Sequence, residues 1–177
     1  MKFLHIKILV TVLVWIILIK CGAEEPTFLK RKSEKKLSDN YYLYWNISND
    51  TIYFEIMART KGCVALGFPV NTDGSEADFI IGYVKESMVY LNDGFKLSGE
   101  EKQIPDVILG GSNDIIEFKG REWNNFTIIE FSRKLNTQDQ FDYSIDPKKS
   151  NKVIWAIGDN DSINGEFIEF GTDEVVF

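Results

Sequence analysis

The sequence contains very little histidine and cysteine. Among its 177 residues there is one histidine, His5, and there are two cysteines, Cys21 and Cys63. Because His5 and Cys21 lie in a predicted signal peptide, the mature chain would carry no histidine and a single thiol. That composition excludes a Ser-His-Asp triad, a Cys-His pair, an imidazole metal site and an internal disulfide. Cys63 lies in an apolar segment, so we expect a buried, inert thiol rather than one that links to a partner.

Residues 1–23 have the three parts of a secretory signal peptide: a cationic start, an apolar core and small residues before the cleavage point. The apolar core, 8–19, is 12 residues long, whereas a membrane-spanning helix needs roughly 20. We therefore predict cleavage after Ala23, a secreted, extracellular protein and no membrane span after cleavage. An uncleaved membrane anchor is the alternative.

The predicted mature chain is strongly acidic. Cleavage removes three of the 20 basic residues and none of the 27 acidic ones, which leaves a net charge of −10. An acidic surface disfavours nucleic acid as a partner. Basic side chains gather in residues 24–40, which we interpret as a solvated N-terminal arm; a processing site or a contact with an acidic partner is the alternative. Residues 41–177 are long enough to form one domain with its own core.

No segment has the pattern of an amphipathic helix of ten or more residues, whereas β patterns recur from Tyr41 onward. In 51–59, the side chains of Ile52, Phe54, Ile56 and Ala58 are predicted to share one buried face. We predict about ten strands: 42–47, 51–59, 62–68, 77–83, 88–91, 115–118, 126–132, 152–157, 166–170 and 174–177. This spacing predicts an all-β, antiparallel sandwich whose core includes Tyr42, Trp45, Trp155 and many phenylalanines.

Carboxylates collect at the ends of the three strands predicted in residues 62–94. Asp73 and Glu76 lie in the loop between the first two of these strands, and the third ends in Asp93-Gly94. Any chemistry of this chain is therefore expected at these strand ends.

Four Asn-x-Ser/Thr sequons are present, as is common in secreted glycoproteins. Their asparagines are Asn46, Asn49, Asn125 and Asn160. Asn49 falls in a predicted turn and is the favoured acceptor, whereas Asn46 falls within a predicted strand.

An ordered series of segments resembles the DOMON domain, the module at the N-terminus of dopamine β-hydroxylase-like copper monooxygenases. The matching segments are 42–45, 54–56, 62–68, 77–82, 91–93, 128–139 with Asp142, and 153–158. The resemblance covers roughly residues 40–171 and implies an immunoglobulin-like β-sandwich. It also implies a domain that binds haem or sugars, or that acts as an interaction module beside an enzyme.

The same resemblance disfavours haem. Haem-binding members use a methionine in the loop before the Ala-Asp strand and a histidine near the C-terminal strand. This chain has Gly74 at the first position and no histidine near Phe167 and Ile168, and haem iron needs strong axial ligands. Met57 is a spare thioether that we expect to serve in packing. The copper catalytic domains have no counterpart in these 177 residues, so we predict no enzymatic activity.

Monooxygenase-associated DOMON domains hold a cation, and the resemblance carries its ligands to four positions here. These are the carboxylates of Asp78 and Asp106 and the backbone carbonyls of Phe79 and Gly94. Ca²⁺ accepts such an oxygen set. The alternative is that Asp93-Gly94 is a hairpin turn and that Asp106, which follows Pro105, is an ordinary loop residue.

Two further features have structural as well as binding interpretations. Arg133 is expected to pair with one of the nearby aspartates, Asp139 or Asp142, and Thr137 to cap a turn. Trp123 is expected to pack in the core or a turn; the alternative is an exposed ring that stacks on sugar.

These observations favour a secreted, non-enzymatic binding or interaction module with a structural Ca²⁺ site. Its partner would be an extracellular protein, a small ligand or a sugar. A haem-binding, cytochrome-like electron-transfer domain and a carbohydrate-binding module are the alternative functions.

Overall fold

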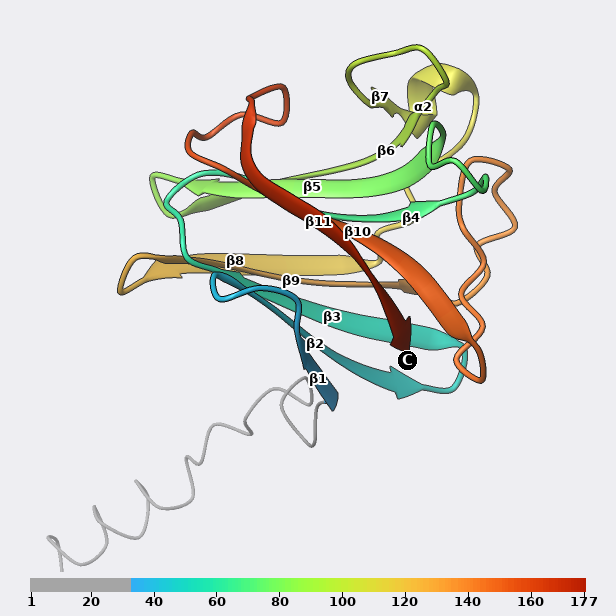
Figure 1. Ribbon diagram of the computed structural model, residues 1–177, viewed down its shortest axis with the longest axis horizontal. Helices are drawn as coiled ribbons and strands as arrows, with labels where there is room; N and C mark the ends of the chain where they lie inside the picture. Colours follow the sequence, from blue (N-terminus) through green and yellow to red (C-terminus); the bar gives the residue numbers. More distant parts are fainter. Residues whose placement is uncertain (1–32) are drawn as a thin grey trace, which may run out of the picture. The chain divides into compact units, whose positions relative to one another are not determined.

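The computed structural model describes residues 33–177, so the predicted signal peptide 1–23 and residues 24–32 of the predicted arm lie outside the described residues. Two antiparallel β-sheets make up almost all of this part of the chain, and Figure 1 shows them stacked face to face. The prediction of an all-β, antiparallel sandwich is confirmed. None of the helices in residues 33–177 has the length and apolar character needed to cross a membrane.

The first sheet has five strands and the second has six. In spatial order the first sheet contains β1 (Ser33–Lys36), β2 (Tyr41–Ser48), β3 (Thr51–Ala58), β9 (Phe126–Lys134) and β8 (Glu117–Trp123). The second contains β11 (Phe167–Val176), β10 (Ser150–Gly158), β4 (Val64–Pro69), β5 (Ala77–Lys85), β6 (Met88–Lys96) and β7 (Ile104–Pro105). A four-residue helix, α2 (Asp106–Leu109), directly follows β7.

Strand β3 shows why the two sheets pack together. The side chains predicted to face inward are all at most 1% exposed: Ile52, Phe54, Ile56 and Ala58. The ring of Phe54 lies 5.2 Å from that of Phe131 in its own sheet and 6.2 Å from that of Phe68 in the second sheet, measured between centroids. The period-two pattern therefore predicts this part of the core correctly.

Trp45 and Trp155 lie in the core as predicted, but Tyr42 does not. The buried tyrosine is Tyr41, whose hydroxyl donates a 2.8 Å hydrogen bond to the backbone carbonyl of Ala65 in the opposite sheet. Because side chains alternate between the two faces of a strand, an assignment shifted by one residue places the wrong tyrosine inside.

The boundaries of several predicted strands differ from the observed ones. The two strands predicted at 166–170 and 174–177 correspond to one strand, β11, which spans Phe167–Val176 and pairs with β10. The predicted strand 115–118 starts too early, because β8 begins at Glu117. Strand β6 continues through Asp93 and Gly94, so these residues do not form the hairpin turn given as an alternative. The β5–β6 turn instead uses Glu86 and Ser87, at φ 51° and 64°.

Part of the predicted solvated arm belongs to the first sheet. Residues Ser33–Lys36 form β1, which pairs with β2 from Trp45 to Tyr42. Lys35 also donates to the side chain of Asp173 in β11 at 2.8 Å, so this basic segment contacts the edges of both sheets.

The lone thiol lies on the outer side of the second sheet, just before β4. Cys63 is 1% exposed and packs with Ala65, Ile81 and Ala156. Burial raises the pKa of the Cys63 thiol. A buried thiol that resists ionisation agrees with the prediction of an inert cysteine.

We expect the Phe54→Ala variant to lose about 3–5 kcal/mol of unfolding free energy, because it opens a cavity between three packed rings. The matched control is Phe170→Ala, since Phe170 is 73% exposed on β11. We expect that control to change the unfolding free energy by no more than about 0.5 kcal/mol. Urea unfolding followed by tryptophan fluorescence measures both. Equal effects of the two substitutions would contradict the assigned core.

Candidate metal centre

Four aspartates from separate segments meet at one end of the sandwich. Asp78 lies on β5, Asp93 on β6, Asp106 at the start of α2, and Asp142 in the segment between β9 and β10. Across β5 and β6, Ile80 pairs with Asp93 and Asp78 pairs with Phe95. Asp78 and Asp93 are therefore diagonal neighbours, and both face the core. The topology thus turns acidic side chains inward where apolar ones would normally lie.

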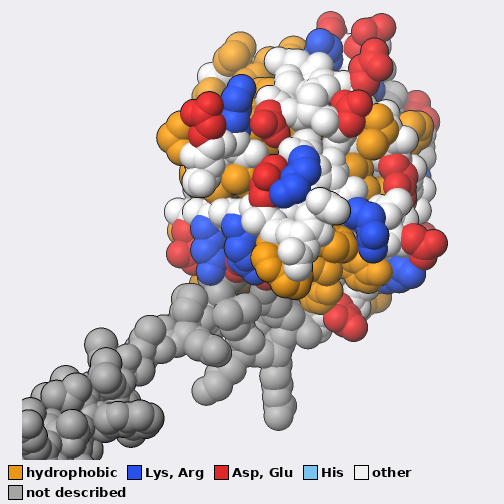
Figure 2. Space-filling model, turned by 90° about the vertical axis from the view of Figure 1, so that its left-hand side faces the viewer, with side chains coloured by type: hydrophobic (Ala, Val, Ile, Leu, Met, Phe, Trp, Pro, Cys, Tyr) orange, Lys and Arg blue, Asp and Glu red, His pale blue; other side chains and the backbone are white. Residues whose placement is uncertain are grey.

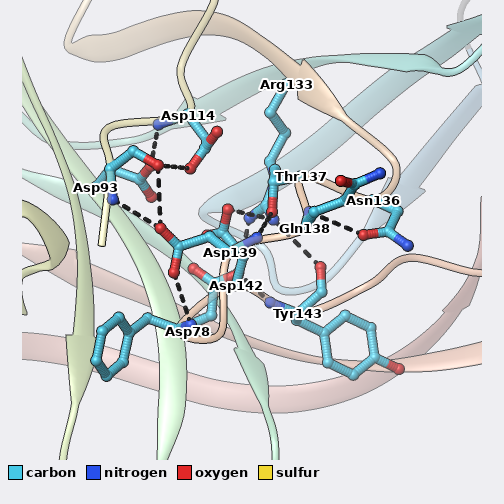
Figure 3. A network of polar contacts seen from close by, with 12 residues as sticks. Asp78, Asp93, Asp114, Arg133, Asn136, Thr137, Gln138, Asp139, Asp142 and Tyr143 are labelled. Carbon is cyan, nitrogen blue, oxygen red and sulfur yellow. Dashed lines mark hydrogen bonds and ion pairs between the residues drawn. The ribbon is translucent and has the colours of Figure 1, made fainter. Parts of the chain in front are cut away.

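The cluster is closely packed and closed to solvent. One carboxylate oxygen from each of Asp78, Asp93 and Asp142 lies within 4.8 Å of the others. Asp78 and Asp106 are 0% exposed and Asp93 is 4% exposed, and the side chain of Asp142 is 1% exposed. Figure 3 shows Asp78, Asp93 and Asp142 turned toward one another beside Arg133.

Arg133 on β9 is the cationic group inside this cluster. Its Nη1 lies 2.7 Å from Asp78 Oδ2 and its Nη2 lies 3.3 Å from Asp142 Oδ2. Nη2 also donates to the backbone carbonyl of Tyr143, and the Tyr143 amide donates to Asp78. Burial alone would lower the pKa of Arg133, but the charges of Asp78 and Asp142 outweigh burial and raise it. The guanidinium therefore stays charged and holds the segment after β9 against β5.

These contacts confirm two structural predictions made from the motif in 131–142. Arg133 pairs with Asp142, and the hydroxyl of Thr137 accepts a hydrogen bond from the amide of Asp139 at 3.2 Å, which closes a turn. The pairing of Arg133 with Asp78 was not predicted, since 55 residues separate them in the chain.

Several carboxylate oxygens in the cluster have no hydrogen-bond donor among residues 33–177. Neither oxygen of Asp106 accepts a hydrogen bond, and Asp78 and Asp93 each leave Oδ1 without a donor. An ionised carboxylate buried without partners is costly in free energy. One arginine cannot balance four such groups, so the cluster fits an additional cation.

The pKa values of these carboxyl groups show the same imbalance. Burial, reinforced by the neighbouring charges of Asp93 and Asp78, raises the pKa of Asp106 to about 8. Burial likewise raises the pKa of Asp142 to about 7 and that of Asp93 to about 6. Burial also raises the pKa of Asp78, although Arg133 opposes the shift. Without a cation, the cluster would take up protons near neutral pH.

The predicted ligand positions come close together in the fold. Asp78 and Asp106 both reach the cluster, and Phe79 and Gly94 are paired residues of β5 and β6 next to it. Sequence reasoning missed Asp93 and Asp142 as candidate ligands. Asp93 was named only among the carboxylates at the strand ends and, as an alternative, as part of a turn, whereas Asp142 was named only as a partner of Arg133. Two signals could have identified them. Asp93 closely follows the apolar segment 88–91, and Asp142 lies in the same motif as the basic residue Arg133.

The predicted sequons and Trp123 occupy different parts of the surface. Asn49 and Asn125 are exposed in hairpin turns at φ 57° and 67°, and Asn160 is exposed in the segment before β11, whereas Asn46 is half-buried in β2. Trp123 is 58% exposed at the end of β8, next to the Asn124–Asn125 turn, so the expectation that it packs in the core is wrong.

Comparison with known proteins identifies the family. The family model of the DOMON domain matches residues 37–158. The chain belongs to the DOMON family. This range includes β2 to β10 and all four aspartates of the cluster.

The DOMON chain is similar to parts of much longer proteins. It is 34% identical over 103 residues to MOXD1 homolog 2 of Drosophila melanogaster, covering 58% of this chain and 13% of that protein. It is 31% identical over 121 residues to DBH-like monooxygenase protein 1 of Mus musculus, covering 68% of this chain and 19% of that protein. The chain thus spans less than a fifth of the length of either relative.

A solved structure with the same fold is the cytochrome b domain of pyranose dehydrogenase from Coprinopsis cinerea. The TM-score is 0.59 at 8% sequence identity, over 81% of this chain and 80% of that chain. At this identity the likeness establishes the fold alone.

The residues at the two expected haem-ligand positions do not fit an axial ligand. Gly74 lies in the β4–β5 loop, where a Cβ would meet nothing within 4 Å, and Phe167 begins β11. Neither side chain offers a nitrogen or sulfur atom to iron. Met57 lies on the outward-facing side of β3, between the inward residues Ile56 and Ala58.

We expect Arg133→Met to destabilise the DOMON fold by about 3–5 kcal/mol, because it leaves Asp78 and Asp142 buried without their cation. Lys134→Met is the matched control, since Lys134 pairs with Asp50 at the exposed β2–β3 turn. The control should cost less than about 1 kcal/mol. Chemical denaturation in chelator measures both values. If the control destabilises the fold as much as Arg133→Met, the central role of Arg133 is wrong.

Proposed function

We propose that this chain is a secreted, non-enzymatic DOMON module for extracellular binding or interaction, and that its acidic cluster holds a structural Ca²⁺. The observation that carries the cation is Asp106, which is fully buried while neither carboxylate oxygen accepts a hydrogen bond from residues 33–177. Oxygen-only donors of this kind suit Ca²⁺ better than a softer metal.

In this proposal Asp78, Asp93, Asp106 and Asp142 supply carboxylate oxygens, with the backbone carbonyls of Phe79 and Gly94 as further donors. When bound, the ion supplies positive charge that keeps these carboxylates ionised. The carboxylates belong to β5, β6, α2 and the segment after β9. Holding them together therefore links four segments that no disulfide could join.

The closed environment of the cluster favours a structural role over a catalytic one. The side chains of Asp78, Asp93 and Asp106 are between 0% and 4% exposed, so a substrate has no route to them. The monooxygenase names belong to relatives of which this chain covers less than a fifth. We therefore assign binding or interaction, rather than catalysis, to this domain.

The ligand or partner is proposed to be an extracellular protein or a small ligand such as a sugar. Carbohydrate binding has one specific observation in its favour, the 58% exposure of Trp123, because an exposed indole ring can stack on a sugar. On the face drawn in Figure 2, basic and acidic side chains are interspersed with apolar ones. That distribution does not favour a polyanion on this face.

We expect millimolar Ca²⁺ to raise the melting temperature relative to chelator. A cation that binds only the folded state stabilises it by about 2.7 kcal/mol at a hundredfold excess over Kd. Asp106→Asn should remove most of the increase without breaking a hydrogen bond, and Asp78→Asn should also reduce it. The control Asp73→Asn, in an exposed loop, should keep it. Differential scanning fluorimetry measures all four proteins, and no calcium response in the wild-type chain would contradict the site.

The stabilisation by Ca²⁺ should increase with pH. Without a cation, the folded-state pKa values of Asp93, Asp142 and Asp106 lie near 6, 7 and 8, above those of an unfolded chain. Without a cation, these groups contribute their full share of the unfolding free energy below about pH 4, where they are protonated. That contribution is lost as pH rises through their folded-state pKa values. Bound Ca²⁺ replaces the protons, so the difference between calcium and chelator should widen from about pH 5 to pH 8. A difference that shrinks over this range would argue against the four aspartates.

We expect the secreted protein to begin at Glu24 and to carry N-linked glycans at Asn49 and Asn125, the two exposed turn sites. Asn49→Gln and Asn125→Gln should each remove one glycan from the intact mass. Asn124→Gln, beside a sequon but outside it, is the control and should remove none. A secreted chain that retains Met1 and has no glycan mass would contradict both proposals.

A further inference from the structure

Among residues 33–177 the two sheets have four edge strands: two of them are short, and the C-terminal part of a third, β11, is bridged by a lysine. Strand β1 has four residues, two of them Lys35 and Lys36, and β7 has two residues that include Pro105. Strand β11 is bridged by Lys35, which donates to the Asp173 side chain and to the carbonyl of Glu174. Short length, proline and lysine are the usual means by which proteins block edge-to-edge pairing.

The fourth edge, β8, is neither short nor interrupted by proline, and its lysine, Lys119, pairs with Glu130 of its own chain. It has seven residues and no proline, and it pairs with β9 on one side only within the described chain. Phe118 is 51% exposed although it pairs with Phe131 and so faces the core side of the sheet. The two basic residues, Lys119 and Arg121, turn to Glu130 of their own sheet at 3.3 and 3.2 Å. An unpaired strand edge of this length is a template for another strand.

A hollow of about 320 Å³ lies beside this edge. It is lined by Val84, the β5–β6 turn and the β8 residues Gly120 to Glu122, together with Lys61. Gly120 carries no side chain, and a Cβ there would lie 2.8 Å from the backbone oxygen of Ile128, 2.9 Å from Ile129 Cδ1 and 3.3 Å from Val84 Cγ2. The hollow therefore lies on the core-facing side of β8, the side that Phe118 also faces, and it can receive an aromatic side chain from a neighbouring strand.

We propose that β8 is a self-association edge, at which two copies of this chain pair antiparallel with Lys119 on the two-fold axis. In this register Glu117 of each copy lies opposite Arg121 of the other, which gives two cross-strand pairs of opposite charge. Phe118 lies opposite Gly120 of the second copy and enters the hollow beside it. Aromatic side chains that cover a glycine on a neighbouring strand stabilise such pairs.

The remaining features of the edge agree with this register. The two Lys119 side chains face each other across the axis, and each has the Glu130 carboxylate of its own chain at 3.3 Å as a counter-charge. The sequon at Asn125 lies in the turn beyond Trp123, outside the paired segment 117–121. The pairing joins the two five-stranded sheets into one continuous sheet.

Sedimentation velocity of the full secreted chain over a range of concentrations tests the proposal. The wild-type chain should form a concentration-dependent dimer. Glu117→Arg should raise its dissociation constant roughly tenfold, because two attractive pairs become repulsive. Arg121→Glu should do the same, and the double variant Glu117→Arg/Arg121→Glu should return the constant to within about threefold of the wild-type value. Glu101→Arg, with the same charge change in an exposed loop, is the control and should have no effect.

Phe118→Ser provides a second test that does not depend on charge. Because Phe118 is half exposed in one copy, the substitution should leave the melting temperature of the monomer almost unchanged while it weakens the dimer. A chain that sediments as a monomer at every concentration would overturn the proposal. So would a dimer that responds equally to Glu117→Arg and Glu101→Arg, or a double variant that does not recover.

Discussion

The buried ion pair between Arg133 and Asp78 is the constraint on which the rest of this end of the sandwich depends. A guanidinium that is 1% exposed is stable only where carboxylates and carbonyls meet it. Asp78 and Asp142 supply the charges, and the Tyr143 carbonyl accepts a further hydrogen bond. The long segment between β9 and β10 therefore lies across the end of the two sheets, where an apolar contact alone would not fix its position.

This arrangement collects more negative charge than Arg133 can balance. Asp93 and Asp106 approach the same buried volume from β6 and α2, and each has an oxygen without a donor. A fold can tolerate such groups by protonation or by a cation. Protonation near neutral pH would leave the stability of the domain dependent on small pH changes. The Ca²⁺ proposed above would remove that dependence, because it is a hard cation that suits carboxylate and carbonyl oxygens.

Sequence patterns predict the fold well where a local rule decides the structure. Strand β3 alternates between buried and half-exposed residues, and Ile52 to Ala58 behave as that alternation requires. The strand predicted over 88–91 ends too early, because the turn signal at Asp93-Gly94 is weaker than pairing with the whole of β5. The cluster itself combines residues as far apart as Asp78 and Asp142, and no local periodicity brings such positions together. Only the resemblance to a family pointed to Asp78 and Asp106 as ligands, and it did not give Asp93 that role.

The acidic cluster and the open edge of the first sheet share a connection. Asp93 leaves Oδ1 to the cluster, but its Oδ2 accepts a hydrogen bond of 2.8 Å from the amide of Asp114. Asp139 holds the amide of Ser112 at 2.6 Å in the same way. These two bonds fix the segment that leads from α2 into β8, as Figure 3 shows for Asp93 and Asp114. Asp93 therefore contacts both the acidic cluster and the segment that leads into β8. The proposed ion site and the proposed pairing edge are therefore connected through one side chain.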